Sequence, residues 1–292
     1  MFRPTSFHSN VSSTDILHFF HISHDFGTSR ATIMTITTII FDVDDCLYDV
    51  GTGFTAHRNT DGATEFMVDN LHFPSKEAAQ QLRDEYFLKY HSTAKGLSAA
   101  EEDGRLPPLP DGVSLQPGEK RFDPNELDKY WATNLDFSML GGSLDQRSLD
   151  TFESLSRSST QIVGFSNGPR LYVERVLKEI GLAQYFEPNK LFGVTDVLPH
   201  CKPDKSSFEF VLNKVGALPE QCIMVEDSMK NIRAAKSLGM KTILIMGKGR
   251  KQQALNKGAS LEPRPQKWVT LRMIKIKPWM PLLKLSRRLT QS

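Results

Sequence analysis

Long hydrophobic runs are missing from this 292-residue sequence, and cysteines are few. No apolar stretch reaches the roughly 18–20 residues that a membrane-spanning helix needs, so we expect no stable membrane insertion. The three cysteines, Cys46, Cys201 and Cys222, have no spacing typical of a zinc site or a disulfide framework, so we expect reduced thiols in a reducing compartment. The eight histidines show no ligand spacing either, and we assign no zinc or iron site.

A net charge of +2 hides an uneven distribution of charge. Residues 248–292 contain twelve Lys and Arg and one acidic residue, which leaves 24 basic and 33 acidic residues in residues 1–247. The body of the chain is therefore acidic, and the basic pI of the whole chain is no argument for binding nucleic acid. Pro278 and Pro281 forbid one continuous helix in the tail. We expect a flexible extension there, with a basic amphipathic surface-binding segment as the alternative.

Residues 1–33 are rich in Ser, Thr, His and Phe and show neither helical nor strand periodicity. A transit peptide is rich in Arg and poor in acidic residues, whereas this segment contains Asp15 and Asp25 as well as two arginines. We therefore expect a disordered or processed leader and a cytoplasmic protein, with an organellar location as the alternative. Met34, directly before the first predicted strand, is an alternative start of the chain.

Strand and helix patterns alternate through most of the chain. Short apolar runs predict strands at residues 36–40, 161–165, 191–194, 222–225 and 241–245. Apolar residues at i, i+3, i+4 and i+7 predict a helix that begins at Pro169, and two further helices are predicted at 206–215 and up to Leu238. Such alternation predicts an α/β fold, a doubly wound parallel sheet with right-handed crossovers, built from residues 34–48 and 148–247.

Residues 49–147 interrupt this alternation with a helical insert. Helices are predicted at 63–70 and at 76–91, the second opened by Ser75, and another begins at Asp123-Pro124. A stretch rich in Pro, Gly and Asp at 99–120 predicts an exposed loop. The insert separates the first predicted strand from the second.

Polar residues cluster in the sequence where predicted strands end. Asp42, Asp44 and Asp45 follow the first strand, Ser166 follows the second, and Glu226 and Asp227 follow the fourth, while Lys202 lies in a loop. Taken singly, each has an ordinary explanation as a turn residue, a helix cap or a solvated charge. Their joint appearance is more informative, because the carboxyl ends of parallel strands meet at one edge, where ligands bind.

These residue types suit phosphoryl transfer. Asp42 can attack phosphorus and form an aspartyl-phosphate, and Asp44 can protonate the leaving oxygen and later accept a proton from water. The Asp42 carboxylate, the backbone carbonyl of Asp44 and Asp227 form an oxygen set that suits Mg²⁺, with Glu226 binding directly or through water. Ser166, nearby backbone N–H groups and Lys202 would hold the phosphate oxygens.

This set of motifs resembles the haloacid dehalogenase superfamily. Asp42-x-Asp44, Ser166, Lys202 and Glu226-Asp227 match its four motifs in order. The resemblance, from about residue 35 to 247, implies a Rossmann-like core and identifies the insert at 49–147, between the first and second motifs, as a helical cap domain. Asp44 favours the phosphatase branch over true dehalogenases. Phe41–Tyr48 and Phe165-Ser166-Asn167 resemble the pyrimidine 5′-nucleotidase group of fungi and plants, which implies that Asn167 joins the phosphate site. Asp45 departs from that group, which has Asn there.

The resemblance implies a Mg²⁺-dependent phosphatase for a small phosphorylated metabolite, with a pyrimidine nucleoside 5′-monophosphate as the leading substrate. A sugar-phosphate or phosphoglycolate phosphatase, or a phosphomutase of the same fold, is the first alternative. A catalytically silent interaction protein is the second. A cap of this kind leaves room for a small molecule, so phosphoproteins are disfavoured as substrates. The oligomeric state is not predicted.

Overall fold

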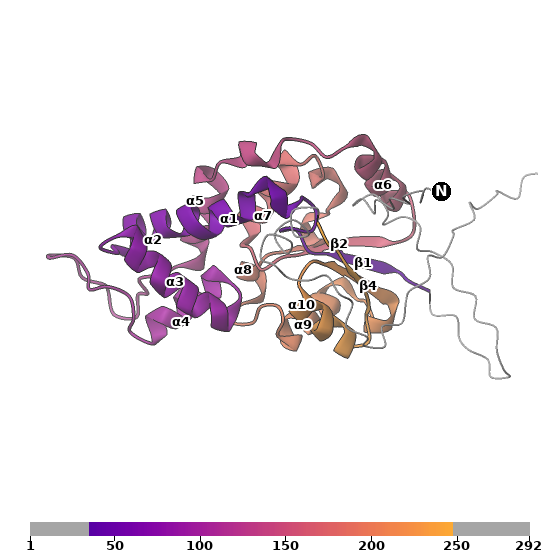
Figure 1. Cartoon of the computed structure of the whole chain (residues 1–292). Helices are drawn as coiled ribbons and strands as arrows, with labels where there is room; N and C mark the ends of the chain where they lie inside the picture. The colour runs from indigo at the N-terminus through magenta and orange to yellow at the C-terminus, as the bar shows by residue number, and fades with distance from the viewer. Residues whose placement is uncertain (1–34, 248–292) are drawn as a thin grey trace, which may run out of the picture. The chain divides into compact units, whose positions relative to one another are not determined.

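The computed structural model describes residues 35–247, whose strands form one five-stranded sheet with the order β3-β2-β1-β4-β5 (Figure 1). The strands are β1 (Thr38–Phe41), β2 (Gln161–Phe165), β3 (Leu191–Phe192), β4 (Cys222–Glu226) and β5 (Lys241–Leu244). Each pair of neighbours is parallel. The predicted α/β fold with a doubly wound parallel sheet is therefore confirmed. The expectations for the leader, the tail and Met34 lie outside the described residues.

Helices cover both faces of the sheet. Figure 1 shows α9 and α10 on one face and α6 and α7 on the other. The helices from residue 146 onward are α6 (Gln146–Ser156), α7 (Arg170–Glu179), α8 (Val194–Val197), α9 (Lys205–Val215) and α10 (Met229–Ser237). Short 3₁₀ turns lie at Ala183–Tyr185, Pro188–Lys190 and Pro219–Gln221.

Successive side chains of β1 point to opposite faces of the sheet, because side chains alternate along a strand. Ile40 is 1% exposed and packs in a cluster with Phe208 of α9 and Ala235 of α10. Phe41 points the other way, and its ring centroid lies 5.1 Å from that of Phe152 in α6. Burial on both faces is typical of parallel sheets. It fixes β1 in the middle of the core and with it the position at which Asp42 leaves the sheet.

The chain between β1 and β2 is mostly helical. It contains α1 (Phe54–His57), a π-helical segment (Arg58–Gly62), α2 (Ala63–Leu71), α3 (Lys76–Tyr90), α4 (Thr93–Glu102) and α5 (Pro124–Asn134), with 3₁₀ turns at Val50–Thr52 and Phe137–Leu140. Ser75 caps α3 by accepting a hydrogen bond from Ala78 N over 3.3 Å. Asp123 caps α5 by accepting one from Asn125 N over 2.9 Å. Both predicted helix starts are confirmed.

Several predicted boundaries were wrong. The loop predicted from residue 99 starts later, because α4 continues to Glu102. The strand predicted at 191–194 ends at Phe192, and Asp196 Oδ2 accepts a hydrogen bond from Gly193 N over 2.8 Å as α8 begins. The helix α6 was not predicted; Asp145 caps it by accepting from Ser148 N over 3.0 Å. The starts of α8 and α6 are thus set by hydrogen bonds from local side chains to backbone N–H groups.

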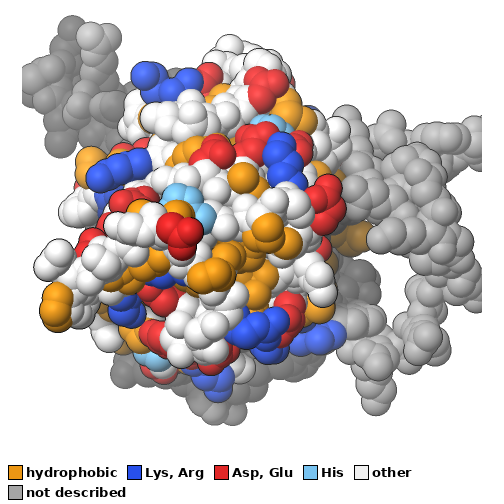
Figure 2. Space-filling model, turned by 90° about the vertical axis from the view of Figure 1, so that its left-hand side faces the viewer, with side chains coloured by type: hydrophobic (Ala, Val, Ile, Leu, Met, Phe, Trp, Pro, Cys, Tyr) orange, Lys and Arg blue, Asp and Glu red, His pale blue; other side chains and the backbone are white. Residues whose placement is uncertain are grey.

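Figure 2 shows the end of the molecule at which α2, α3 and α4 lie. Acidic and basic side chains are intermixed on this face, with hydrophobic side chains between them. The face therefore has no patch of a single charge sign that would attract a polyanion. Within residues 35–247, no helix has the length and hydrophobicity required to cross a membrane.

Candidate active site

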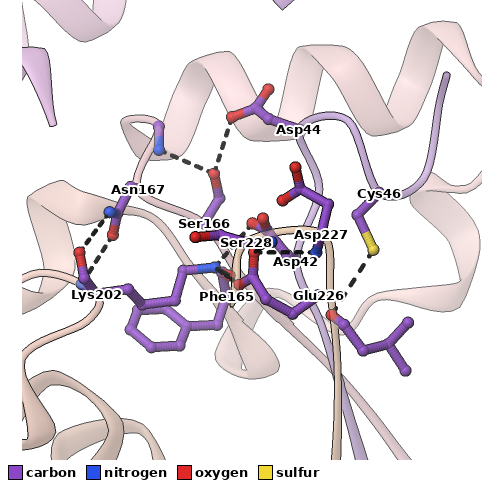
Figure 3. A network of polar contacts seen from close by, with 12 residues as sticks. Asp42, Asp44, Cys46, Phe165, Ser166, Asn167, Lys202, Glu226, Asp227 and Ser228 are labelled. Carbon is purple, nitrogen blue, oxygen red and sulfur yellow. Dashed lines mark hydrogen bonds and ion pairs between the residues drawn. The ribbon is translucent and has the colours of Figure 1, made fainter. Parts of the chain in front are cut away.

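The carboxyl ends of β1, β2 and β4 bring the predicted site residues to one edge of the sheet (Figure 3). Phe41 at the end of β1 pairs with Gly164 of β2 and with Val225 of β4, so the three strands end at nearly the same level. Asp42 N continues the ladder by donating a hydrogen bond to Val225 O over 2.9 Å. The register thus places the residues that follow these strands side by side.

Lys202 reaches this edge from the loop between α8 and α9. Its Nζ lies 2.8 Å from Asp42 Oδ1 and 2.9 Å from Glu226 Oε2, and donates to Phe165 O over 2.8 Å. The residue is 1% exposed, so the three donors of the ammonium group are used inside the protein. Burial alone would lower the pKa of Lys202, but the carboxylates of Asp42 and Glu226 outweigh burial and raise it. Lys202 is therefore a fixed positive charge beside Asp42.

Three buried carboxylates lie close enough to share a cation. Oxygens of Asp42, Glu226 and Asp227 all lie within 4.8 Å of one another. Burial and the charge of Glu226 raise the pKa of Asp42, although Lys202 acts against them. A divalent cation would oppose both effects, and an all-oxygen donor set is the kind that Mg²⁺ prefers. These residues therefore fit Mg²⁺, which Asp42 and Asp227 would hold.

Both oxygens of Glu226 already have protein partners. Oε2 accepts from Lys202, while Oε1 accepts from Asp227 N over 3.2 Å and from Ser228 N over 3.0 Å. Glu226 is fully buried, so these contacts orient both Lys202 and the turn that carries Asp227. This arrangement favours contact with a metal through water over direct coordination. The predicted ligand role of the Asp44 backbone carbonyl stays a prediction.

The Asp44 carboxylate points away from Asp42 (Figure 3) and toward the helical insert. Its Oδ2 lies 2.6 Å from Arg58 Nη1 and accepts from Ser166 Oγ over 3.2 Å. Its Oδ1 accepts from Tyr48 Oη over 2.7 Å and from Tyr172 Oη over 2.5 Å. Burial alone would raise the pKa of Asp44, but Arg58 and the two tyrosine hydroxyls outweigh burial and lower it. In this arrangement Asp44 is an ionised carboxylate held by four donors.

Ser166 and Asn167 follow β2 and join the two halves of the site. Ser166 is fully buried, and its Oγ accepts from Gly168 N over 2.8 Å while donating to Asp44. The Asn167 side chain donates to Lys202 O over 2.8 Å and to His91 O over 3.2 Å, and its Oδ1 accepts from Lys202 N over 2.9 Å. Asn167 therefore orients the Lys202 loop and contacts the insert. Because these contacts use the side-chain amide, the predicted contact between Asn167 and phosphate would be made by its backbone N–H.

Tyr172 is held in place by a residue of the insert. Asp128 of α5 is 3% exposed and accepts hydrogen bonds from Leu171 N over 3.0 Å and from Tyr172 N over 2.9 Å. The N-cap residue of α7 is Pro169, whose side chain makes no capping hydrogen bond. The carboxylate of Asp128 therefore satisfies N–H groups that the first turn of a helix leaves open. This contact sets the position from which Tyr172 reaches Asp44.

Sequence reasoning missed the residues around Asp44. Tyr172 lies in a helix predicted from its apolar periodicity alone, and Arg58 lies in a segment for which no element was predicted. Tyr48 stands within the Asp42 motif without a predicted role. Asp45, the departure from the nucleotidase pattern, has a φ of 55° and accepts from Thr55 Oγ1 over 2.7 Å. Asp is among the residues that tolerate this left-handed backbone. No spacing in the sequence signals that Tyr48, Arg58 and Tyr172 meet at Asp44.

Known proteins resemble the chain over parts of its length. It is similar to phosphoglycolate phosphatase 1 of Pseudomonas aeruginosa, with 33% identity over 93 residues, covering 32% of this chain and 33% of that protein. It is also similar to the phosphoglycolate phosphatase of Pectobacterium atrosepticum, with 26% identity over 134 residues, covering 46% of this chain and 53% of that protein. The chain thus spans about a third to a half of the length of these relatives.

A solved structure shows the same fold. CbbY from Rhodobacter sphaeroides, in complex with phosphate, matches with a TM-score of 0.50 and 18% identity, covering 73% of this chain and 87% of that one. The model of the haloacid dehalogenase-like hydrolase family matches residues 36–239, which include β1, the insert and all the site residues above. By this match the chain belongs to the haloacid dehalogenase-like hydrolases.

Proposed function

We propose that this protein is a magnesium-dependent phosphomonoester hydrolase that works through an aspartyl-phosphate on Asp42. One observation carries the proposal: a buried ammonium, Lys202 Nζ, lies 2.8 Å from Asp42 within a cluster of carboxylates whose oxygens lie within 4.8 Å of one another. A nucleophilic carboxylate, a fixed cation and an oxygen set for a metal are the parts that phosphoryl transfer requires. Phosphatases among the similar proteins support the same reaction class.

In the first step, an oxygen of Asp42 attacks phosphorus and the bond from phosphorus to the ester oxygen breaks. The protonated carboxyl of Asp44 gives its proton to that oxygen, so an alcohol leaves. In the second step, water gives a proton to Asp44 and attacks phosphorus, the bond to Asp42 breaks, and inorganic phosphate leaves. Lys202 would hold a phosphate oxygen by exchanging its contact with Asp42 for one with the phosphate, and Ser166 would hold another once Asp44 turns away from its hydroxyl. When bound, Mg²⁺ supplies positive charge to the phosphate.

For this role Asp44 must turn from the arrangement in the structure. It is now an ionised carboxylate that contacts Arg58, Tyr48 and Tyr172, whereas the first step needs a protonated carboxyl that faces the ester oxygen. Ser166 donates to Asp44 over 3.2 Å and is also a proposed phosphate ligand, so a turn of Asp44 past Ser166 would bring its carboxyl toward the phosphate.

Two substrate classes follow from different observations. The sequence motifs around Asp42 and Ser166 favour a pyrimidine nucleoside 5′-monophosphate. The similar curated proteins favour phosphoglycolate, the substrate in their names. The two leaving groups differ in charge, since a nucleoside is neutral at pH 7 and glycolate carries a carboxylate. A sugar phosphate lies between them in size.

The test is steady-state hydrolysis of UMP, CMP, AMP, 2-phosphoglycolate and hexose phosphates, with Mg²⁺ and with a chelator. We expect Mg²⁺-dependent release of phosphate from one class and loss of at least about 10³-fold in Asp42→Asn, in keeping with removal of a nucleophile. Acid-quenched wild-type enzyme should carry phosphate on Asp42. Hydrolysis that persists in Asp42→Asn, or no hydrolysis of any substrate, would contradict the proposal and favour an interaction protein.

A further inference from the structure

The connection between α4 and α5 contains a proline-rich segment at the surface. The segment is formed by residues 105–110, Arg-Leu-Pro-Pro-Leu-Pro, and it contains neither helix nor strand. Figure 1 shows the connection as a loop that projects from the end of the insert, beyond α2 and α4. The same loop contains Val113, which is 50% exposed, and Leu115, which is 37% exposed. Exposed apolar groups gathered in one place are typical of interaction sites.

Proline restricts the backbone of the whole segment. Each proline has its φ fixed near −65°, and each residue before a proline is directed away from the α region toward extended or polyproline II backbone. Residues 107, 108 and 110 are prolines, and residues 106, 107 and 109 each precede one. Local sterics therefore favour a polyproline II conformation from residue 106 to residue 110. A segment restricted in this way loses little conformational entropy when a partner binds it.

Two arginines hold the segment in place. Arg105 forms a two-pronged pair with Glu85 of α3, with Nη1 donating to Oε1 over 3.3 Å and Nη2 donating to Oε2 over 3.1 Å. Arg121 donates one hydrogen bond to Pro107 O and another, over 3.0 Å, to Leu71 O at the end of α2. The segment is thus fixed to the insert at its start and near its middle, which adds to its preorganisation.

A polyproline II helix has three residues per turn and therefore three edges. Residues 106 and 109, both leucine, share one edge and are both partly buried. The second edge contains Pro107, which is partly buried, and Pro110, which is exposed. The third edge contains Arg105 and Pro108, which are both exposed. The leucine edge is therefore the covered one, and a partner can reach the two edges that contain the prolines.

The backbone of the segment offers acceptors and few donors, because proline has no N–H. Among the residues that the structure describes, none donates a hydrogen bond to the carbonyl oxygens of Leu106, Pro108 and Leu109. Apolar rings beside open carbonyl acceptors are complementary to tryptophan and tyrosine, because these side chains combine an apolar face with an N–H or O–H donor. The surface that fits this segment is therefore a groove lined by aromatic side chains.

We propose that residues 105–110 are a docking site for a partner protein, a domain with an aromatic-lined groove that binds proline-rich segments as polyproline II helices. In the complex, the exposed rings of Pro108 and Pro110 pack on aromatic side chains of the groove, and the open carbonyls accept hydrogen bonds from its tryptophan and tyrosine donors. The docking site uses no residue of the sheet edge, so it does not depend on the proposed function.

The test is isothermal titration calorimetry of the full chain with a panel of purified Src-homology 3 and WW domains, which have grooves of this kind. At least one domain should bind with a Kd below about 10⁻⁴ M. With that domain, Pro108→Ala and Pro110→Ala should each weaken binding at least about tenfold, because each removes an anchor from the groove. Absence of binding to every domain of the panel would overturn the proposal.

Pro117→Ala is the matched control, because Pro117 is exposed in the same loop but lies outside the segment. It should bind as tightly as the wild type, and a loss equal to that of Pro108→Ala would overturn the assignment to residues 105–110. A synthetic peptide of residues 103–112 gives a second measurement that needs no variant, since it should compete with the full chain for the domain. A peptide that binds a domain to which the full chain does not bind would show that the fold covers the segment, which would also overturn the proposal.

Discussion

Replacing Lys202 by methionine should cost about 3–5 kcal/mol of the free energy of unfolding, because removing one partner leaves buried charges uncompensated. The ammonium lies 2.8 Å from Asp42 and 2.9 Å from Glu226, and Lys202 is 1% exposed. Methionine retains most of the volume of the side-chain stem, so the packing loss is small. For a domain with a typical stability of about 5–15 kcal/mol, this loss is a large fraction of the total.

Urea unfolding followed by circular dichroism measures this loss, and a thermal scan should show the melting temperature about 6–20 °C lower. Lys76→Met is a matched control. Lys76 Nζ also lies 2.8 Å from a carboxylate oxygen, that of Glu65, but the two side chains are 53% and 39% exposed. An exposed pair contributes at most about 1 kcal/mol, so this variant should unfold close to the wild type.

A second substitution tests the cause of the loss. Adding Glu226→Gln to Lys202→Met removes one of the uncompensated charges, so the double variant should regain part of the stability. If Lys202→Met loses no more stability than Lys76→Met, or if the double variant is less stable than Lys202→Met, the electrostatic account of this cluster is wrong.

Three further outcomes are expected. Asp128→Ala should lower the free energy of unfolding by about 1–3 kcal/mol in urea, because it leaves the buried N–H of Tyr172 and the part-buried N–H of Leu171 without acceptors at the start of α7; an unchanged midpoint would contradict this. Burial raises the pKa of Cys201 to about 11, so iodoacetamide should modify it at pH 8 at least about tenfold more slowly than a free cysteine, and faster as pH rises toward 11. Burial and the charge of Lys230, whose Nζ lies 3.0 Å from His91 Nε2, lower the pKa of His91. The folded state thus disfavours the proton, so stability should fall as pH drops below the usual histidine pKa, and His91→Gln should flatten the change in urea midpoint between pH 7 and 5.5.

The sheet and its edge were predictable because their physics is local. Alternating apolar runs and helix signals identify strands, and parallel strands must end at one edge, so the meeting of Asp42, Ser166 and Asp227 follows from order along the chain. The magnesium and substrate assignments go beyond this geometry and stay proposals. The division of the chain into core, cap, leader and tail also stays a prediction.

The environment of Asp44 was not predictable in the same way. Arg58 reaches Asp44 from the insert, and Tyr172 reaches it from α7. The start of α7 is held in turn by Asp128 of α5, which belongs to the insert. Such contacts depend on how helices pack, which periodicity does not encode. The helix α4 was missed for a related reason: it contains Gly96, a poor helix former, at a place where a Cβ would lie 3.2 Å from the Tyr86 Cβ.

The hydrogen bonds from α7 to Asp128 have a mechanical consequence. They fasten the insert to the sheet layer on one flank through a buried carboxylate and two backbone donors. The insert also contacts the sheet layer through Ser92 Oγ, through the backbone carbonyls of Tyr90 and His91, and through the exposed pair of His91 and Lys230. Any movement of the insert that admits a substrate should therefore break the solvent-exposed contact between His91 and Lys230 before the buried hydrogen bond from Tyr172 N to Asp128.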